Sequence, residues 1–436
     1  MQDQVEVVER SAPVTAWKGS AEIAAAALRA IFADHFADKY AIELWDGTRF
    51  GPTQSTAQFT LRITEPGALR FAFRPPLELN AGRAFAAGLL DVEGDLELAV
   101  DLLYDRMRKL RIGSAIKLQS LLSRLPKSHV PALRESRLRG AIHSPERDRA
   151  AISFHYDYPT EFYRSFLETP LVYSCAYFDD KVTTLEDAQL SKIDYILRKL
   201  RLQPGDRLLD IGCGWGALAI RAAKCYGARV LGVTLSRAQC EEAQRGVESA
   251  GVGHLASIEM RDYRELDGES FDKIASVGMF EHVGRSKLPE YFSTAFALLR
   301  PGGLFLNHGI ADQDLQGSRG KIGGFVERFV FPDGELLSIG DALQIAQRAG
   351  FEVRDVENLR EHYTLTLRAW VKNLERNRAE AVAAAGEQAY RIWRLYMAAS
   401  AQGFRVGRIG VFQALLAKRR SDGSTGVPPT RRDLYT

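Results

Sequence analysis

Residues 207–220 read RLLDIGCGWGALAI, an apolar run followed by a glycine loop and an Ala-rich segment. The apolar run predicts a buried strand that ends at Asp210, and the Ala-rich pattern predicts a helix after the loop. Gly212, Gly214 and Gly216 fall on alternate positions between them, where the missing side chains let a ligand approach the backbone and the free N–H groups of the helix start. The stretch therefore predicts a strand, loop and helix that bind a nucleotide-like molecule.

The same loop also satisfies the loose dinucleotide pattern G-x-G-x-x-G/A, with Ala217 in the last position. A dinucleotide site carries an Asp or Glu about 20 residues past the loop to hold a ribose. The next predicted strand, Arg229–Val233, is followed instead by Thr234, Leu235 and Ser236. Pyrophosphate binding is therefore disfavoured, and the loop predicts a different nucleotide-like ligand.

Segments of strand and helix character alternate through the rest of the chain. Strands are predicted at Arg207–Asp210, Arg229–Val233, Ser257–Met260, Phe271–Val277, Gly303–His308 and Phe351–Val356. Such alternation is typical of a mostly parallel, doubly wound α/β sheet. The polar, Pro-containing stretch 139–150 predicts an exposed linker. We therefore expect two domains, residues 1–140 and residues 141–436.

The first 140 residues predict a small α+β domain. Residues 20–36 have the pattern of an Ala-rich helix, and the alternating segments Ala41–Trp45, Gln58–Ile63 and Leu69–Phe73 predict strands. Residues 82–103 predict helix with a glycine-containing break. At the other end of the chain, the Gly/Pro-rich stretch 421–433 predicts disorder.

Residues 104–138 alternate apolar residues with cations. The cations that carry this pattern are Arg106, Arg108, Lys109, Arg111, Lys117, Arg124 and Lys127. Basic amphipathic stretches of this kind adsorb to anionic membranes by burying apolar area and by charge attraction. A linker helix whose apolar face packs on the protein explains the composition equally well.

The composition is that of a globular protein with room for two domains: 436 residues, 46% hydrophobic and 26% charged. No apolar stretch of about 18 residues occurs, and the acidic start lacks a signal-peptide pattern, so we expect a cytoplasmic protein. A net charge of only +3 argues against general nucleic-acid binding. The cysteines, Cys175, Cys213, Cys225 and Cys240, form no C-x-x-C pair and predict neither disulfides nor a metal site.

Several longer stretches follow one another in a characteristic order. They are FHYDYPTEFYRSFL (154–167), LVYSCAYF (171–178), LDIGCGWG (209–216), GVTLSRAQ (232–239), RDYREL (261–266), GMFEHVG (278–284), HYTLTLRAW (362–370) and YMAASAQGFRVGRIGVFQ (396–413). Together they resemble the cyclopropane fatty acid synthase family, class I methyltransferases that use S-adenosylmethionine. The resemblance covers most of residues 150–418. It implies a Rossmann-like methyltransferase domain that follows a smaller, lipid-facing N-terminal domain in the sequence.

The resemblance also implies how the donor is bound. Its methionine end would lie against Asp210 and the glycine loop, with Tyr173 and Ser174 near the carboxylate and Tyr156 closing over it. The implied donor-binding residues are Tyr156, Tyr173, Ser174, Asp210, Gly212, Gly214, Gly216, Thr234, Leu235, Ser236, Gln239, Asp262, Tyr263 and Gly278. Taken alone, the Asp262-Tyr263 pair has the pattern of a surface turn, so its assignment to the adenine depends on the resemblance.

Members of the resembling family hold a bicarbonate ion as the base. The matching positions imply that its ligands are the side chains of Cys175, Glu281, His308 and Tyr363 and the N–H of Ile310. An ionised Glu281 repels an anion unless it accepts the ion's own O–H, so we expect it to orient the proton. One by one, these residues also fit a buried core. The chain has Gly309 after the histidine, where family members commonly carry Thr.

The resemblance implies a cyclopropane-fatty-acyl-phospholipid synthase, a homodimer at the inner face of a membrane that acts on phospholipids with unsaturated acyl chains. Three alternatives stay open. A related lipid C-methyltransferase would form a methylene or methyl branch, since it needs the same donor and a base. A non-catalytic lipid-binding protein on a methyltransferase fold, and a small-molecule N- or O-methyltransferase, are more distant alternatives.

Overall fold

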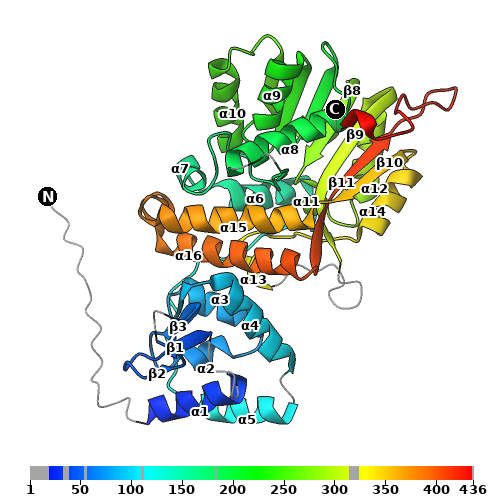
Figure 1. Ribbon diagram of the computed structural model, residues 1–436. Coiled ribbons are helices and arrows are strands. Elements are labelled where there is room, and N and C mark those ends of the chain that lie inside the picture. The colour runs from blue at the N-terminus through cyan, green and yellow to red at the C-terminus, as the bar shows by residue number, and fades with distance from the viewer. Residues whose placement is uncertain are drawn as a thin grey trace. The chain divides into compact units, whose positions relative to one another are not determined.

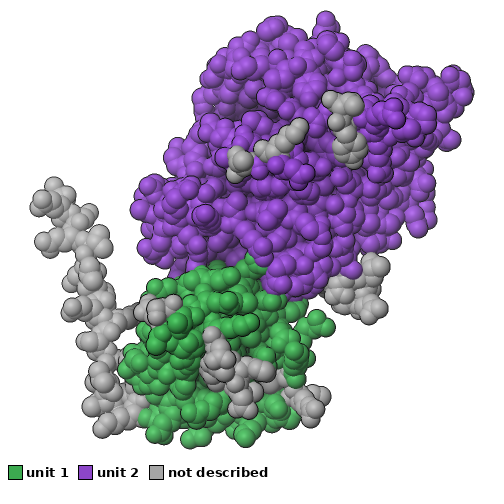
Figure 2. Space-filling model, viewed as in Figure 1, with its two compact units in different colours: residues 1–133 green, residues 134–436 purple. Residues whose placement is uncertain are grey.

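The computed structural model describes residues 19–32, 39–53, 56–109, 112–180, 182, 184–313 and 324–434. The chain divides into two compact units, residues 1–133 and residues 134–436, coloured green and purple in Figure 2. This division falls slightly before the boundary at residue 140 that the linker composition predicts. Residues 33–36 of the predicted first helix and Leu110 and Arg111 of the basic segment lie outside the described residues.

Unit 1 contains helices and a small sheet, as expected for an α+β domain. Its elements are α1 (Ser20–Phe32), β1 (Tyr40–Glu43), β2 (Arg49–Phe50), β3 (Phe59–Ile63), α2 (Ala68–Ala72), α3 (Leu77–Ala86), β4 (Leu90–Gly94), α4 (Leu96–Lys109) and α5 (Ile112–Ser123). The strands form one sheet in the order β2-β1-β3-β4, in which β1 and β3 run parallel.

One prediction for unit 1 is wrong, and a second is confirmed only in part. The expected strand at Leu69–Phe73 lies in helix α2, where Ala68, Leu69 and Ala72 are buried at helical spacing. The expected helix at 82–103 is interrupted by strand β4, which pairs antiparallel with β3. A short apolar run fits a helix and a strand equally well by its pattern, so neighbouring elements decide between them.

Unit 2 is built on a seven-stranded sheet in the order β10-β11-β9-β8-β5-β6-β7 (Figure 1). The strands are β5 (Arg207–Ile211), β6 (Arg229–Thr234), β7 (Ala256–Met260), β8 (Phe271–Val277), β9 (Leu299–Asp312), β10 (Glu352–Asn358) and β11 (Ile409–Ala417). The strands from β5 to β9 pair parallel, while β11 runs antiparallel to both β9 and β10. The mostly parallel sheet is therefore confirmed, and β11 is the strand that the sequence pattern missed.

Helices cover both faces of this sheet (Figure 1). The helices are α6 (Pro145–Tyr156), α7 (Thr160–Arg164), α8 (Leu185–Lys199), α9 (Ala217–Tyr226), α10 (Arg237–Ser249), η3 (Tyr263–Glu265), α11 (Phe280–Val283), α12 (Leu288–Leu298), α13 (Gly324–Phe329), α14 (Ile339–Arg348), α15 (Arg360–Arg376), α16 (Arg378–Arg405) and η4 (Arg432–Leu434). Alternate residues of β5 feed two separate cores: Leu208 packs with α8, α9 and α10, and Leu209 packs with α12 and α14. This two-sided burial is the reason the strands are continuous apolar runs, and it confirms the doubly wound fold.

The predicted disorder of residues 421–433 is wrong. Arg431 forms an ion pair with the buried Asp355, and Arg201 Nε lies 2.8 Å from Asp433 Oδ2. Leu434 is buried. These contacts reach far along the chain, so local composition does not reveal them.

In the described part of the chain, no helix is both long enough and apolar enough to span a bilayer.

Candidate functional site

The glycine loop after β5 forms as the sequence predicts. Gly212 has a φ of 77°, and an added Cβ there would lie 3.2 Å from Met279 Cγ. Gly216 has a φ of 84° at the N-cap of α9, and an added Cβ would lie 3.0 Å from Ala243 Cβ. Only glycine adopts these left-handed conformations without strain. The loop therefore turns tightly and leaves the space above Gly214 open.

A cavity lies over this loop at the carboxyl ends of the parallel strands. Its lining includes the predicted donor-binding residues Tyr156, Tyr173, Ser174, Asp210, Gly212, Gly214, Thr234, Leu235, Gln239, Asp262, Tyr263 and Gly278. Gly216 and Ser236 are not part of the lining. The structure places both at helix starts, where Ser236 Oγ accepts a hydrogen bond from the Gln239 N–H. The switch point of an open α/β sheet is where such folds bind ligands.

The Asp210 carboxyl and the Ser174 hydroxyl, which both line the cavity, suit ligand groups of opposite charge. Asp210 Oδ2 is buried and has no partner among the described residues. Burial raises the pKa of the Asp210 carboxyl to about 7, and the Lys192 ammonium partly opposes this rise. Lys192 Nζ donates to Ser174 Oγ at 2.8 Å, so the Ser174 proton is free to point elsewhere. This part of the cavity suits an amino acid, with Asp210 for its ammonium and Ser174 for its carboxylate.

The segment after β6 is ordered by its own side chains. Thr234 Oγ1 donates to Gln239 Oε1 at 3.0 Å and accepts from the Ser236 N–H at 3.2 Å. These bonds fix the side chain of Gln239 in the cavity wall. The segment thus presents a polar but uncharged surface, as the comparison with dinucleotide sites predicts.

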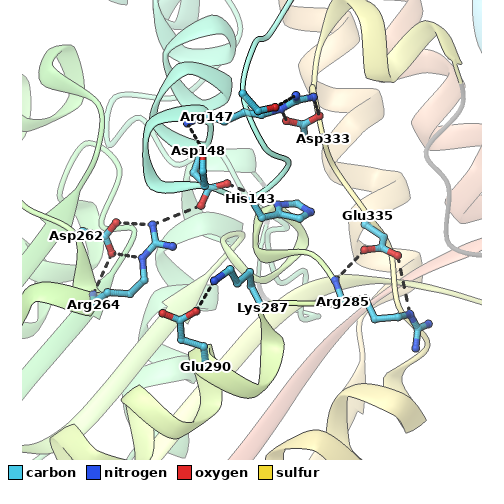
Figure 3. A network of polar contacts seen from close by, with 12 residues as sticks. His143, Arg147, Asp148, Asp262, Arg264, Arg285, Lys287, Glu290, Asp333 and Glu335 are labelled. Atoms are coloured by element: carbon cyan, nitrogen blue, oxygen red, sulfur yellow. Dashed lines mark hydrogen bonds and ion pairs between the residues drawn. The ribbon is translucent and has the colours of Figure 1, made fainter.

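A network of ion pairs and hydrogen bonds holds helix α6 next to the segment that follows β7 (Figure 3). Asp262 accepts from Arg264 Nε at 2.9 Å and from Arg264 Nη2 at 2.6 Å. The same Arg264 reaches Asp148 on α6 at 3.4 Å, and Arg147 of α6 pairs with Asp333. Since α6 also carries Tyr156, this network holds one wall of the cavity in place.

Aromatic rings form another wall of the cavity. Tyr156, Tyr173 and Trp215 line it, and the Tyr156 and Trp215 rings are T-shaped with centroids 6.1 Å apart. The ring of Tyr163 packs against the ring of Trp215, with their centroids 4.8 Å apart. Aromatic faces attract cations, so this wall suits a positively charged sulfonium.

The predicted base residues, Cys175, Glu281, His308, Ile310 and Tyr363, are here called the base cluster. Burial raises the pKa of the Tyr363 hydroxyl well above its usual value, and electrostatic interactions with Tyr396, Cys175 and Glu281 add to the rise. Burial raises the pKa of Glu281 to about 7, and the nearby backbone groups of Glu281 and Ile310 partly oppose the rise. Glu281 Oε2 has no partner among the described residues.

His308 joins the base cluster from strand β9. Burial, helped by the charges of Lys192 and Lys199, holds the pKa of His308 well below its usual value, so the ring is neutral. Its Nδ1 lies 3.2 Å from Gln413 Nε2, and its Nε2 has no partner in the described chain. Among the described residues, no hydrogen bond or ion pair joins the His308 side chain to the other four members; the Lys192 charge acts on both His308 and Cys175.

The base cluster lies directly behind the donor cavity without lining it. Cys175 follows Ser174 in the chain, and the N–H of Gly278 donates to the carbonyl of His308 at 2.8 Å. The unpartnered oxygen of Glu281 and the unpartnered nitrogen of His308 are buried polar atoms that a bound oxyanion would satisfy. These two atoms are therefore open hydrogen-bonding groups at which a small oxyanion with its own O–H could bind.

Sequence reasoning missed Lys192, Trp215 and Arg261, which also line the cavity. Lys192 is the informative omission, because it is a buried cation on the apolar face of α8 beside Ile193 and Ile196. Lys192 and Lys199 lie among apolar residues at helical spacing in α8, and buried lysines in such a pattern are the signal that marks them. Over the described residues, no group of His, Cys, Asp or Glu side chains is arranged to hold a metal ion.

The comparisons with known proteins identify the family of this chain. A family model for mycolic acid cyclopropane synthetase matches residues 143–414. A probable fatty acid methyltransferase of Pseudomonas putida is 41% identical over 404 residues, 90% of this chain and 95% of the relative. Cyclopropane mycolic acid synthase 1 of Mycobacterium tuberculosis is 37% identical over 275 residues, 61% of this chain and 95% of that protein.

Two solved structures resemble unit 2. The structure of the cyclopropane synthase MmaA2 from Mycobacterium tuberculosis matches with a TM-score of 0.58 and 34% identity. The match covers 62% of this chain and 97% of the MmaA2 chain. A mycolic acid cyclopropane synthase in complex with SAH and CTAB has a TM-score of 0.59 and 36% identity with the same coverage. The chain therefore belongs to the mycolic acid cyclopropane synthetase family of S-adenosylmethionine-dependent methyltransferases.

Proposed function

We propose that this chain transfers the methyl carbon of S-adenosylmethionine to a cis double bond of a phospholipid acyl chain and closes a cyclopropane ring. The observation that carries the proposal is the pairing of two neighbouring sites. A donor cavity with an unpartnered Asp210 lies directly in front of a buried cluster whose Glu281 and His308 atoms lack protein partners. A simple methyl transfer to a nitrogen or oxygen would not need the second site.

The chemistry explains why two sites are required. An alkene is a weak nucleophile, so attack on the sulfonium breaks the S–CH3 bond, forms a C–C bond and leaves a carbocation on the acyl chain. Ring closure then takes a proton from the new methyl group, and the C–H electron pair forms the last ring bond. This sequence needs a dry pocket, aromatic faces and a base beside the new carbon.

Bicarbonate would supply that base by accepting the proton. The His308 ring and the Tyr363 hydroxyl would hold it as donors, together with the Ile310 N–H. Because the pKa of Glu281 is about 7, its carboxyl is able to accept the ion's O–H near neutral pH. Cys175 would fill the remaining side as a small thiol, since burial holds its pKa far above its usual value.

A second candidate product is a methylene or methyl branch. The Pseudomonas putida relative, which matches across both units, is described as a probable fatty acid methyltransferase and not as a cyclopropane synthase. Such an enzyme would use the same donor and lose a different proton from the carbocation.

The deciding experiment incubates the protein with S-adenosylmethionine, bicarbonate and vesicles of cis-monounsaturated phospholipid. Mass spectrometry of the acyl chains detects the added carbon, and proton NMR detects ring methylene signals. Ring signals support the cyclopropane product, while added mass without them supports the branched alternative. Donor binding without any modified lipid would contradict the substrate, and no donor binding would favour the non-catalytic lipid-binding alternative.

We also propose that unit 1 binds the inner, cytoplasmic face of a membrane. Helix α4 ends in Arg106, Arg108 and Lys109, and α5 exposes Ile116. Arg106 and Lys109 pair with Asp105, and the remaining cationic surface together with an exposed apolar side chain in the same unit suits a surface of anionic lipid. A chain that acts on membrane phospholipids needs such a surface, and we keep the homodimer as part of this proposal.

Vesicle sedimentation at rising salt tests the membrane proposal. Replacing Arg106, Arg108 and Lys109 together by Gln should weaken binding to anionic vesicles and flatten its salt dependence. The matched control replaces three exposed cations of unit 2, Lys224, Arg229 and Arg245, by Gln. Equal losses in both variants would contradict a role for α4. Sedimentation velocity of the free protein tests the homodimer.

A further inference from the structure

The ring of His308 is held by a glutamine on the neighbouring strand. In the antiparallel pairing of β9 with β11, His308 and Gln413 lie directly opposite each other, so their side chains share one face of the sheet. Gln413 Nε2 lies 3.2 Å from His308 Nδ1, and both residues are almost fully buried. Gln413 is also the one amide in the apolar run of β11.

Lys199, at the end of α8, fixes the orientation of this amide. Its Nζ donates to Gln413 Oε1 at 2.8 Å, forms an ion pair with Glu357 and lies 4.4 Å from the centre of the Tyr195 ring. An ammonium has three donors and no acceptor. The Gln413 atom that faces Lys199 must therefore be the oxygen, and the NH2 group must face His308.

The position of the proton on His308 follows from this arrangement. Because the amide NH2 can only donate, His308 Nδ1 must accept and carries no hydrogen. A neutral imidazole keeps one proton, which must then be on Nε2, the nitrogen that has no partner in the described chain.

We infer that Lys199 and Gln413 form a relay that locks His308 as the neutral Nε2–H tautomer, a hydrogen-bond donor aimed at an oxygen anion and not a base. Lys199 and Gln413 are positioning residues, since they act through His308. The tautomer follows from the contacts alone, while the identity of the anion as bicarbonate rests on the proposed function.

The tautomer is directly measurable, and two other histidines serve as internal standards. His155 Nδ1 lies 2.9 Å from the Val330 carbonyl, which only accepts, so His155 must carry its proton on Nδ1. His362 Nδ1 accepts from the Phe178 N–H at 3.0 Å, so a neutral His362 carries its proton on Nε2. Long-range proton–nitrogen NMR spectra of histidine-labelled protein distinguish the two forms, and His→Asn variants assign the signals.

We expect His308 to give the His362 pattern and His155 to give the opposite one. A protonated Nδ1 on His308 would overturn the inference. Bicarbonate should shift the Nε2–H signal of His308 and leave those of His155 and His362 in place; an unmoved His308 signal would overturn its role as an anion ligand. If both results hold but no lipid is modified, the proposed function fails and the inference stands.

Two variants of Gln413 sharpen the test. In Gln413→Glu the new carboxylate only accepts, so His308 Nδ1 should become protonated. In Gln413→Met the lock is removed, and we expect turnover to fall about tenfold, the loss of one oriented hydrogen bond, with a raised bicarbonate requirement and unchanged SAH affinity. Gln244→Met, which removes a glutamine hydrogen bond between α10 and β7, is the matched control. Equal losses in Gln413→Met and Gln244→Met would contradict the relay.

Discussion

The donor cavity and the base cluster are built in opposite ways. The donor cavity takes most of its walls from short segments that follow β5, β6, β7 and β8, each of which is a continuous motif. The base cluster takes single residues from distant parts of the chain, such as Cys175, His308 and Tyr363. A site made of loops is visible in local sequence, whereas a site made of isolated side chains exists only after folding.

The two sites also treat a buried carboxyl differently. Asp210 and Glu281 both have a pKa raised to about 7 by burial. The Lys192 ammonium lowers the pKa of Asp210. The charge of Glu281 instead raises the pKa of tyrosines such as Tyr363 and Tyr396. Under the proposed function, ionised Asp210 would bind the donor's ammonium, and Glu281 would share a proton with the ion.

The largest expected effect separates the sites by turnover. Glu281→Gln keeps the shape of the side chain but removes its ability to accept a proton, so turnover should fall about 100-fold or more. SAH affinity, measured by calorimetry, should stay unchanged because Glu281 does not line the cavity. Glu290→Gln, on the exposed face of α12, is the control. A parallel loss of SAH affinity would place Glu281 in the donor site instead.

The reverse pattern is expected for Asp210→Asn. Loss of a charge-assisted contact to the donor's ammonium should weaken SAH binding about 10- to 100-fold. 5′-Methylthioadenosine, which lacks the amino acid end, should bind both proteins alike. Asp272→Asn, at the opposite end of β8, should leave both affinities intact. Weaker binding of both ligands would indicate a collapsed loop and not a lost ion contact.

The pH dependence of donor binding should be smaller but distinctive. A bound ammonium favours ionised Asp210, so below about pH 7 binding must first expel a proton from the free protein. SAH affinity should therefore fall as the pH drops through 7, by up to about tenfold per pH unit, and level off above it. Calorimetry in buffers of different ionisation enthalpy counts the released proton. The same slope in Asp210→Asn would assign the titration to another group.

The smallest expected effect concerns Gly309. An added Cβ would lie 2.9 Å from Phe280 Cβ and 3.2 Å from Glu281 Oε2, so Gly309→Ala must displace one of them. We expect a loss of about 1–3 kcal/mol in stability and a few-fold loss of turnover, with unchanged SAH affinity. Thermal melts and steady-state rates measure both. Gly253→Ala, where nothing lies within 4 Å, should change neither; an equally neutral Gly309→Ala would show that the base cluster tolerates the extra methyl.

Much of the donor site was predictable from sequence. The strands β5, β6 and β8 coincide with apolar runs in the sequence. Gly212 and Gly214 make the loop after β5 recognisable from the sequence. What could not be predicted is which residues beside the loop touch the ligand: Ser236 caps a helix, whereas the unpredicted Lys192 reaches the cavity from α8. Capping and lining depend on the direction of one side chain, which local patterns do not specify.

The base cluster residues were named only through the resemblance to a family, because each alone fits a buried core. Their surroundings were not predictable at all. The relay from Lys199 through Gln413 to His308 joins α8, β11 and β9, and β11 was itself missed as a strand. Its antiparallel pairing with β9 brings together residues more than a hundred positions apart in the chain.

The sequence by itself determined the α/β class, the glycine loop and the nature of the donor site. These depend on periodicity and on backbone freedom, which neighbouring residues set. Only the tertiary structure decided the raised pKa of the Asp210 and Glu281 carboxyls and the proton position on His308. Those properties depend on burial and on partners from distant strands and helices, and the strength of an electrostatic interaction follows distance in space and not distance along the chain.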